Sequence, residues 1–247
     1  MMIKKLTIVI PAYNEADNLE QLFPRFHKAV QDLRAKQIDA EMVVVNDGSS
    51  DATAAKSREN HVTVVSHPFN LGVCAALHTG FLYALENDSD ALITVDADGQ
   101  HNPEDIHYLI REFEKRNSDV IIGSRFVEKT GYKKEFLRFS GIKLFSVLVK
   151  LLTHLTIHDV TSGFRVFDKK AIRFLSNHFP EDYPDAEILI LLNKSGFKVE
   201  EVPIEMNPRM QGTSQHNLKS ALLYPFKNLL TILIVLIRTL QKKRANT

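Results

Sequence analysis

Short apolar runs alternate with longer amphipathic stretches along the first half of this chain. The runs are rich in β-branched residues and are bounded by polar clusters, which is typical of buried strands. The predicted strands are Leu6–Ile10, Glu41–Val45, Val62–Ser66, Ala91–Val95 and Asp119–Gly123. Between them apolar side chains recur at helical spacing, for example over Leu71–Glu86. Strands that alternate with helices predict an α/β fold with a mainly parallel sheet.

Two prolines refine this pattern. Pro103 is followed by two acids and predicts the start of a helix, because proline suits the first helical turn and acids complement the helix dipole. Val199–Met206 has the pattern of a strand that contains Pro203. Proline cannot donate a hydrogen bond within a sheet, so we expect this strand at an edge.

Polar loops follow the predicted strands at positions that matter for function. They are Pro11–Glu15, Asn46–Asp51, Asp96–His101 and Gly123–Phe126. Open parallel sheets bind ligands beyond the carboxyl ends of their strands. The sequence therefore predicts that these loops converge on one crevice.

Asp96 and Asp98 directly follow a buried strand and are separated by one small residue. In extended chain such residues point to the same side, so both carboxylates could reach one cation. Mg²⁺ and Mn²⁺ prefer such oxygen ligands and share their other positions with water and phosphate. Gln100 and His101 are further candidate ligands. An acidic loop that only caps the helix near Pro103 is the alternative, and the convergence of the loops favours the functional site.

Two more residues of the crevice suit a nucleotide diphosphate. The Asp47 carboxylate could act as a base or hold a ribose hydroxyl, and the Arg125 guanidinium suits phosphate oxygens. A surface ion pair is the alternative for Arg125. Neither the P-loop motif nor the glycine motif of dinucleotide sites is present.

Composition excludes little. The chain has 247 residues, 44% hydrophobic and 25% charged, which is ordinary for a globular protein. A formal net charge of +1 does not indicate a nucleic-acid partner. Cys74 is the single cysteine, so we expect no intrachain disulfide and a reducing compartment. The run Leu6–Ile10 is too short for a signal peptide.

Six motifs occur in an order that resembles a known family. They are VIPAYNE (Val9–Glu15), VVNDGSSD (Val44–Asp51), FNLGVCAALHTGF (Phe69–Phe81), VDADGQHNPED (Val95–Asp105), GSRF (Gly123–Phe126) and DVTSGFRVF (Asp159–Phe167). Together they resemble the inverting family 2 glycosyltransferases of GT-A fold, above all the polyprenyl-phosphate sugar transferases of the dolichol-phosphate mannose synthase group. The resemblance covers about residues 5–215.

The resemblance implies a Rossmann-like GT-A catalytic domain over residues 1–215, with a mainly parallel sheet flanked by helices. The implied nucleotide-sugar-binding residues are Pro11, Ala12, Tyr13, Glu15, Asp47, Asp96, Ala97, Asp98 and Arg125. The implied ligands of a divalent Mg²⁺ or Mn²⁺ are Asp96, Asp98 and Gln100. The implied acceptor-binding residues are Asp159, Ser162 and Arg165, and the catalytic set is Asp96, Asp98, Arg125 and Asp159.

The implied reaction moves a sugar from a UDP- or GDP-sugar to a polyprenyl phosphate, for cell-wall polysaccharide or glycan assembly. A lipid phosphate is already anionic and needs no general base. A sugar hydroxyl of a lipid-linked or polysaccharide glycan is the alternative acceptor, for which Asp159 or Asp185 would be the candidate base.

Two other function classes are less well supported by the sequence. A nucleotidyltransferase usually carries a glycine-rich, basic loop after its first strand, whereas the loop PAYNEADN has neither glycine nor a basic residue. A non-catalytic scaffold on a membrane would not need the intact set of Asp96, Asp98, Gln100 and Arg125.

Two amphipathic stretches concern the membrane. Leucines recur over residues 136–157, which by periodicity alone predicts a helix packed on the domain. The resemblance implies instead an interfacial helix whose Lys143 and Lys150 meet lipid head groups. The loop Arg209–Gln215 resembles one that closes over the donor phosphate in this family, although a lysine common there is missing.

The second stretch, residues 216–247, predicts a membrane- or partner-facing helix with a basic tail. Its apolar part, residues 228–237, is about ten residues long, whereas a membrane span needs roughly 20. We therefore expect a peripheral protein at the cytoplasmic face of the cell membrane. A small membrane partner protein or a homo-oligomer would supply the anchor. The alternative is a helix that pairs with its copy in a soluble dimer.

Overall fold

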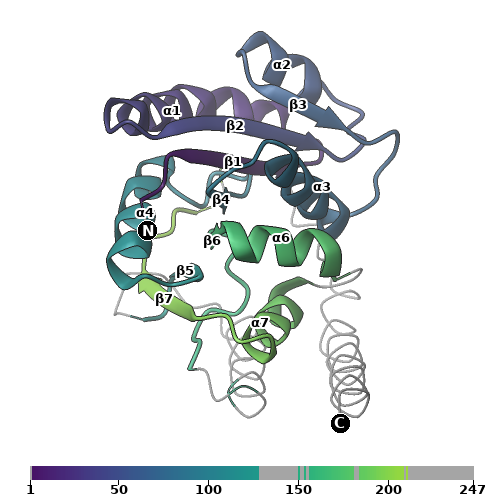
Figure 1. Ribbon diagram of the computed structural model, residues 1–247. Helices are drawn as coiled ribbons and strands as arrows, with labels where there is room; N and C mark the ends of the chain where they lie inside the picture. Colours follow the sequence, from purple (N-terminus) through teal and green to yellow (C-terminus); the bar gives the residue numbers. More distant parts are fainter. Residues whose placement is uncertain are drawn as a thin grey trace.

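The computed structural model describes residues 2–127, 150, 153, 156–180, 184–208 and 210. These residues form one seven-stranded sheet in the order β3-β2-β1-β4-β6-β5-β7 (Figure 1). The strands are β1 Lys5–Ala12, β2 Asp39–Asn46, β3 Thr63–Ser66, β4 Ala91–Thr94, β5 Val120–Ser124, β6 Arg165–Asp168 and β7 Val199–Pro203. Only β6 runs antiparallel to its neighbours, β4 and β5. The predicted mainly parallel sheet is confirmed.

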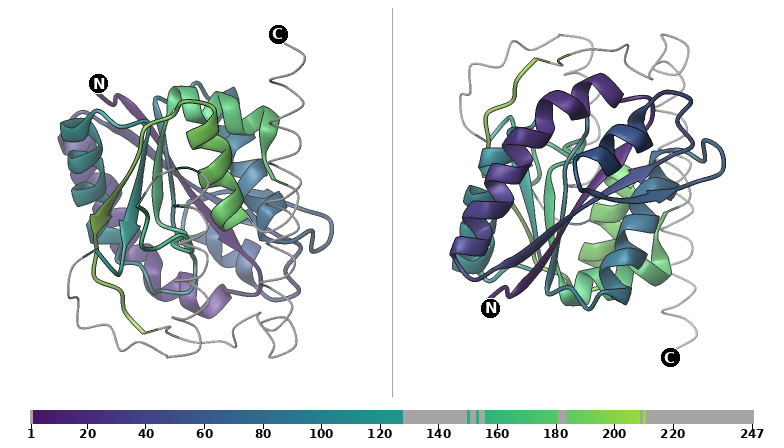
Figure 2. Two further views of the ribbon diagram at one scale, coloured as in Figure 1. Left: turned by 90° about the horizontal axis from the view of Figure 1, so that it is seen from below. Right: turned by 90° about the horizontal axis from the view of Figure 1, so that it is seen from above.

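Helices cover both faces of the sheet (Figure 2). They are α1 Ala16–Ala35, α2 Thr53–Glu59, α3 Val73–Glu86, the short 3-10 helix η1 Pro103–Asp105, α4 Ile106–Arg116, α6 Lys169–His178 and α7 Pro184–Lys194. Helices α1 and α4 lie on one face, and α3, α6 and α7 lie on the other. The result is a three-layer α/β/α architecture.

Alternation along the strands builds two cores. In β1, Ile8 and Ile10 pack with α1 and α4, whereas Val9 packs on the opposite face with α3. Helix α3 approaches β1 closely, since a Cβ at Gly80 would lie 2.3 Å from a methyl carbon of Val9. Both faces of the central strands are therefore buried under helices, which explains their continuous apolar runs.

The sequence prediction differs from the structure at two points. Pro11 and Ala12, predicted in a loop, belong to β1 and pair with Val45 and Asn46 of β2. Strand β6 was not predicted, because its four residues include only two apolar ones, Val166 and Phe167, flanked by charged residues. The expected edge position of the strand with Pro203 is confirmed, since β7 ends the sheet.

Parts of the membrane prediction lie outside the described residues. These are the helix over 136–157, apart from residues 150, 153, 156 and 157, the loop 209–215 apart from Met210, and the tail 216–247. Among the helices that the structure describes, none combines the length and the apolar character required to cross a bilayer.

The topology brings six strands to the predicted crevice. Strands β1, β2, β4, β5 and β7 all end at this edge of the sheet. Strand β6 runs the other way and begins there, with Arg165 opposite Thr94 and Ile122. The segment 158–164 that enters β6 therefore lies among the loops that follow the parallel strands.

Asp168 lies at the other end of the strands, and its charge should affect the free energy of unfolding. Its carboxylate caps α6 by accepting a hydrogen bond from the Ala171 amide at 2.7 Å. Burial, together with the like charge of Asp119, raises the pKa of Asp168 to about 6. A carboxyl group whose pKa is higher in the folded than in the unfolded chain destabilises the fold once it ionises. The free energy of unfolding therefore falls as pH rises from about 4 to 6 and stays lower above that range.

We expect Asp168→Asn to raise the free energy of unfolding at pH 7 by about 1–2 kcal/mol, a value reduced for solvent screening. Asparagine keeps the capping acceptor and removes the charge. At pH 4 the gain should be small, because the native carboxyl is protonated there. Urea denaturation at both pH values measures the difference. Equal effects at pH 4 and pH 7 would contradict this account.

Candidate active site

The loops after β1 and β2 are fastened to each other. Asn14 adopts a positive φ of 55°. Its side-chain oxygen accepts the Ser50 amide at 2.9 Å, and its own amide donates to Ser49 Oγ at 2.9 Å. Asp51 accepts the Ala16 amide at the start of α1 at 3.1 Å. These bonds hold the predicted donor-binding loop against the end of β2.

Asp47 organises the segment that leads into α3. Its two carboxylate oxygens accept the Leu71 amide at 2.9 Å, the Gly72 amide at 2.8 Å and a bond with His67 Nδ1 at 2.7 Å. The backbones also approach closely, since a Cβ at Gly48 would lie 2.3 Å from the Phe69 carbonyl carbon. The structure thus gives Asp47 a role in shaping the loop, and its contact with a nucleoside stays a prediction.

The Asp-x-Asp segment follows β4 in the middle of the crevice. Ala97 packs into the core below, whereas the Asp96 side chain is 41% exposed. Asp98 is 8% exposed and accepts the Gln100 amide at 3.0 Å. Gly99 at φ 77° makes the turn. Both carboxylates follow the carboxyl end of β4 as the strand-and-loop pattern predicts, and their contact with one shared cation stays a prediction.

A divalent cation fits the residues of this loop. A Cβ at Gly163 would lie 2.6 Å from Asp96 Oδ2, so the absence of a side chain there makes room for the carboxylate. The oxygen donors suit Mg²⁺ and Mn²⁺. No cluster of three or more His, Cys, Asp or Glu suited to a metal occurs in the described part of the chain. Gln100, water and donor phosphate would have to complete the coordination of a cation held by Asp96 and Asp98.

The segment after β7 covers the back of this loop. The Asn207 amide donates to the Gln100 carbonyl at 2.9 Å, and the Met210 amide donates to the Asp98 carbonyl at 3.2 Å. The Met210 sulfur lies 2.3 Å from the position that a Cβ on Gly99 would take. The predicted donor-closing loop thus starts directly on the Asp-x-Asp turn.

Arg125 and Asp159 form a buried ion pair. The guanidinium donates to both carboxylate oxygens at 2.6 Å, and the Arg125 amide donates to Oδ2 at 3.1 Å. The two side chains are 3% and 0% exposed. Arg125 therefore does form an ion pair, but the pair is buried, so the alternative of a pair at the surface is wrong. Because both Asp159 oxygens are occupied by Arg125, a role of this carboxylate as general base has no support in the structure.

The other predicted acceptor residues also make internal contacts. The Arg165 guanidinium donates to the backbone carbonyls of Ser162 at 2.7 Å and Val160 at 2.8 Å. Ser162 Oγ accepts the Phe164 amide at 3.2 Å. These bonds shape the segment that enters β6, and direct contact of Ser162 or Arg165 with an acceptor stays a prediction.

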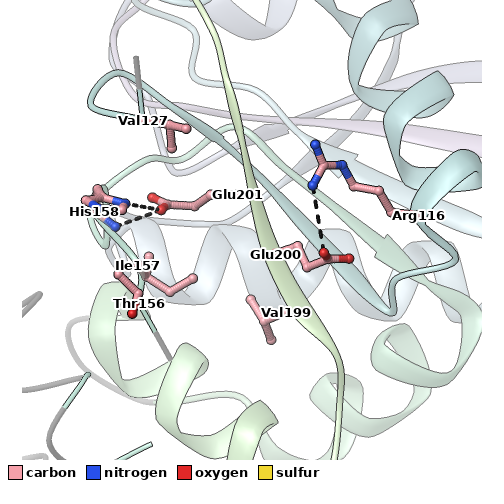
Figure 3. Close-up of a pocket in the computed structure, with 8 residues that line it drawn as sticks. All are labelled: Arg116, Val127, Thr156, Ile157, His158, Val199, Glu200 and Glu201. Carbon is pink, nitrogen blue, oxygen red and sulfur yellow. Dashed lines mark hydrogen bonds and ion pairs between the residues drawn. The ribbon is translucent and has the colours of Figure 1, made fainter. Parts of the chain in front are cut away.

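Glu201 is a supporting residue that sequence reasoning missed. It accepts the amides of His158 at 2.8 Å and Asp159 at 2.7 Å, and it bonds to His158 Nδ1 at 3.0 Å. Figure 3 shows that Glu201 and its neighbour Glu200 point to opposite sides of β7, where Glu200 pairs with Arg116. Glu201 lies 42 positions from Asp159, so no local pattern could reveal this contact.

His101 lies deep beside the Asp-x-Asp turn. Its ring stacks on Phe164 with 5.0 Å between centroids, and its Nδ1 is 3.7 Å from Asp96 Oδ2. Burial, aided by the positive charge of Arg125, lowers the pKa of His101 to about 4, and the negative charges of Asp98 and Asp159 oppose that shift. The imidazole is therefore neutral near pH 7.

Glu201 and Glu200 provide a matched pair of variants. Glu201→Gln should lower the free energy of unfolding by about 2 kcal/mol, because one of the two hydrogen bonds to the amides of His158 and Asp159 is lost and the other no longer involves a charged acceptor. Glu200→Gln should lower it by less than about 1 kcal/mol, since its ion pairs are partly exposed. Urea denaturation of both variants measures the contrast. Equal losses would contradict a special role for Glu201.

Known proteins share this architecture. The model of glycosyl transferase family 2 matches residues 7–175. A UDP-N-acetylglucosamine–dolichyl-phosphate N-acetylglucosaminyltransferase of Methanococcus voltae is 30% identical over 225 residues, which cover 83% of this chain and 86% of that protein. A dolichol-phosphate mannosyltransferase of Pyrococcus furiosus is 31% identical over 220 residues, and these cover 85% of this chain but 59% of that protein.

The structural comparison agrees with the family match. Glucosyl-3-phosphoglycerate synthase from Mycobacterium tuberculosis, crystallised with Mn²⁺, uridine diphosphate and phosphoglyceric acid, matches with a TM-score of 0.67. The match covers 94% of this chain and 78% of that chain at 17% identity, so it shows the GT-A fold alone. Since the family match runs from β1 into α6 and includes both sides of the crevice, this chain belongs to glycosyl transferase family 2 and is a glycosyltransferase.

Proposed function

We propose that this chain is a metal-dependent inverting glycosyltransferase that moves a sugar from a nucleotide sugar to a polyprenyl phosphate at a membrane surface. The observation that carries the proposal is the position of Asp96 and Asp98 at the carboxyl end of β4, beside the buried pair of Arg125 and Asp159. The names of the relatives from Methanococcus voltae and Pyrococcus furiosus, which act on dolichyl phosphate, support the acceptor class.

The donor would lie along the ends of β1, β2 and β4. Pro11 and Ala12 end β1, Tyr13 and Glu15 flank Asn14, which fastens this loop to the end of β2, and Asp47 holds the adjoining segment before α3. The nucleoside is assigned to this side because the diphosphate must reach Asp96 and Asp98. A comparison of UDP-sugars with GDP-mannose as donors distinguishes a uracil base from a guanine base.

Asp96, Asp98 and Gln100 would hold the divalent cation. A bound cation supplies positive charge where the leaving diphosphate develops negative charge. Contact of Arg125 with the diphosphate stays a prediction, and its ion pair with Asp159, which offsets much of its charge, fixes the position of its guanidinium. The acceptor oxygen would attack the anomeric carbon from the face opposite the leaving diphosphate, which inverts the configuration.

The burial and pairing of Asp159 support a phosphate over a hydroxyl as the acceptor. A sugar hydroxyl needs a base within hydrogen-bond reach to take its proton. Asp159 is buried and paired with Arg125, and the side chain of Asp185, the other candidate base, lies outside the described residues. A prenyl phosphate is anionic at neutral pH and needs no such base. A lipid acceptor places the reaction at a membrane surface, for which residues 136–157 and 216–247, a membrane partner or a second copy would provide contact.

A transfer assay with the purified chain tests the proposal. UDP-glucose, UDP-N-acetylglucosamine, UDP-galactose and GDP-mannose are each offered with undecaprenyl phosphate in detergent, with Mn²⁺ or with EDTA. We expect one donor to give an organic-soluble glycolipid only when the metal is present. Asp98→Asn should lower the rate by about 100-fold or more, because a ligand of the cation is lost.

Asp17→Asn is the matched control for this assay. Asp17 lies on α1, its side chain is 72% exposed, and it pairs only loosely with Lys56 at 3.5 Å. The Asp17→Asn variant should transfer the sugar at the wild-type rate. Full transfer in EDTA would overturn the metal dependence. Transfer to a sugar hydroxyl with none to the lipid phosphate would favour the alternative acceptor.

A further inference from the structure

His101 carries a feature that the proposed reaction does not use. Its side chain is 1% exposed, and neither ring nitrogen has a hydrogen-bond partner among the described residues. Buried polar atoms without partners destabilise a fold, so they indicate a partner that is provided in another state of the site. A carboxylate oxygen of Asp96 lies 3.7 Å from the Nδ1 atom of His101.

The two groups lie slightly too far apart to form a hydrogen bond. Nδ1 of His101 lies 3.7 Å from Oδ2 of Asp96, whereas such a bond needs about 2.7–3.2 Å. The imidazole is held in place, because it stacks at 29° on the fully buried ring of Phe164. The backbone of Phe164 is fixed in turn, since its carbonyl accepts the Gly123 amide of β5 at 2.9 Å. A small rotation of Asp96 would close the gap.

Gly163 lets the Asp96 carboxylate lie beside His101. The Asp96 side chain is 41% exposed, and a Cβ at Gly163 would lie 2.6 Å from Oδ2 and 2.7 Å from Oδ1. Thr94 Oγ1 donates to the Gly163 carbonyl at 2.6 Å, which fixes this wall of the site. The carboxylate therefore lies between the wall formed by Gly163 and the ring of His101, with Oδ2 the oxygen near Nδ1.

We infer that His101 is a positioning residue for Asp96: its Nδ1–H donates to Oδ2 of Asp96 when a divalent cation occupies the site. The inference rests on the proposed function, because it concerns the same candidate metal ligand. Residues that orient metal ligands in this way change metal affinity about tenfold or more when they are replaced. The role is distinct from that of a metal ligand, since the imidazole acts through the carboxylate.

Three replacements of His101 separate the roles of its ring. Phenylalanine keeps the stacking on Phe164 and removes both nitrogens. Asparagine places an amide donor near the position of Nδ1, and glutamine places it near Nε2. His107→Phe is the matched control, because His107 also has a buried nitrogen without a partner among the described residues and lies 3.8 Å from a carboxylate, that of Asp32 on α1.

The measurement is the dissociation constant of Mn²⁺, from the electron paramagnetic resonance signal of free Mn²⁺, with UDP and separately with GDP present. We expect His101→Phe and His101→Gln to raise it about tenfold. His101→Asn should stay within about threefold of the wild type, and His107→Phe should leave the constant unchanged. If His101→Phe fails to fold, the comparison of Asn with Gln decides alone.

Each other outcome overturns a specific statement. Wild-type affinity in His101→Phe, or equal weakening in the Asn and Gln variants, would overturn the role of His101 and leave the metal site intact. A ¹⁴N coupling in the electron spin echo of bound Mn²⁺ that disappears in His101→Phe would make His101 a ligand and overturn the positioning role. Absence of Mn²⁺ binding by the wild type with either nucleotide would overturn the proposed metal site and this inference with it.

Discussion

The buried ion pair of Arg125 and Asp159 is the interaction on which the arrangement of the crevice depends. Taking two charges out of water costs free energy that is offset only when the remaining hydrogen-bonding capacity of both groups is used. Here the carboxylate accepts three N–H groups of Arg125, and its backbone is held by Glu201 from the edge strand. The end of β5, the segment before β6 and strand β7 are thereby tied together. Loss of either charge would leave the other buried without its partner at the edge where the loops converge.

The sheet topology explains why this pair lies next to the candidate metal loop. Strand β6 is inserted antiparallel between β4 and β5, so its first residue stands at the edge where its neighbours end. The segment that enters β6 therefore reaches from Asp159, next to the end of β5, to Gly163, next to Asp96 at the end of β4. A single antiparallel strand in a parallel sheet thus joins the donor side of the crevice to the side assigned to the acceptor.

Local patterns explain how much the sequence could predict. The parallel strands β1, β2, β4 and β5 are largely buried on both faces, so their apolar runs stand out, and Asp96 and Asp98 are visible as a spaced pair directly after one of them. Strand β6 has only two apolar residues between two charged ones, which is too little for a pattern. Arg125 was visible as a cation, but its partner Asp159 is 34 positions away, and the support from Glu201 is more distant still. Contacts at such separations follow from the order of strands, which no local period encodes.

The central claim is that a nucleotide diphosphate and a divalent cation meet at the carboxyl end of β4. Anomalous diffraction at the manganese edge, from crystals grown with Mn²⁺ and either UDP or GDP, tests it most directly. The account predicts one strong anomalous peak in contact with the carboxylates of Asp96 and Asp98, with diphosphate oxygens against it. A nucleotide bound in the crevice without manganese at these residues, or a peak at another place, would contradict the account.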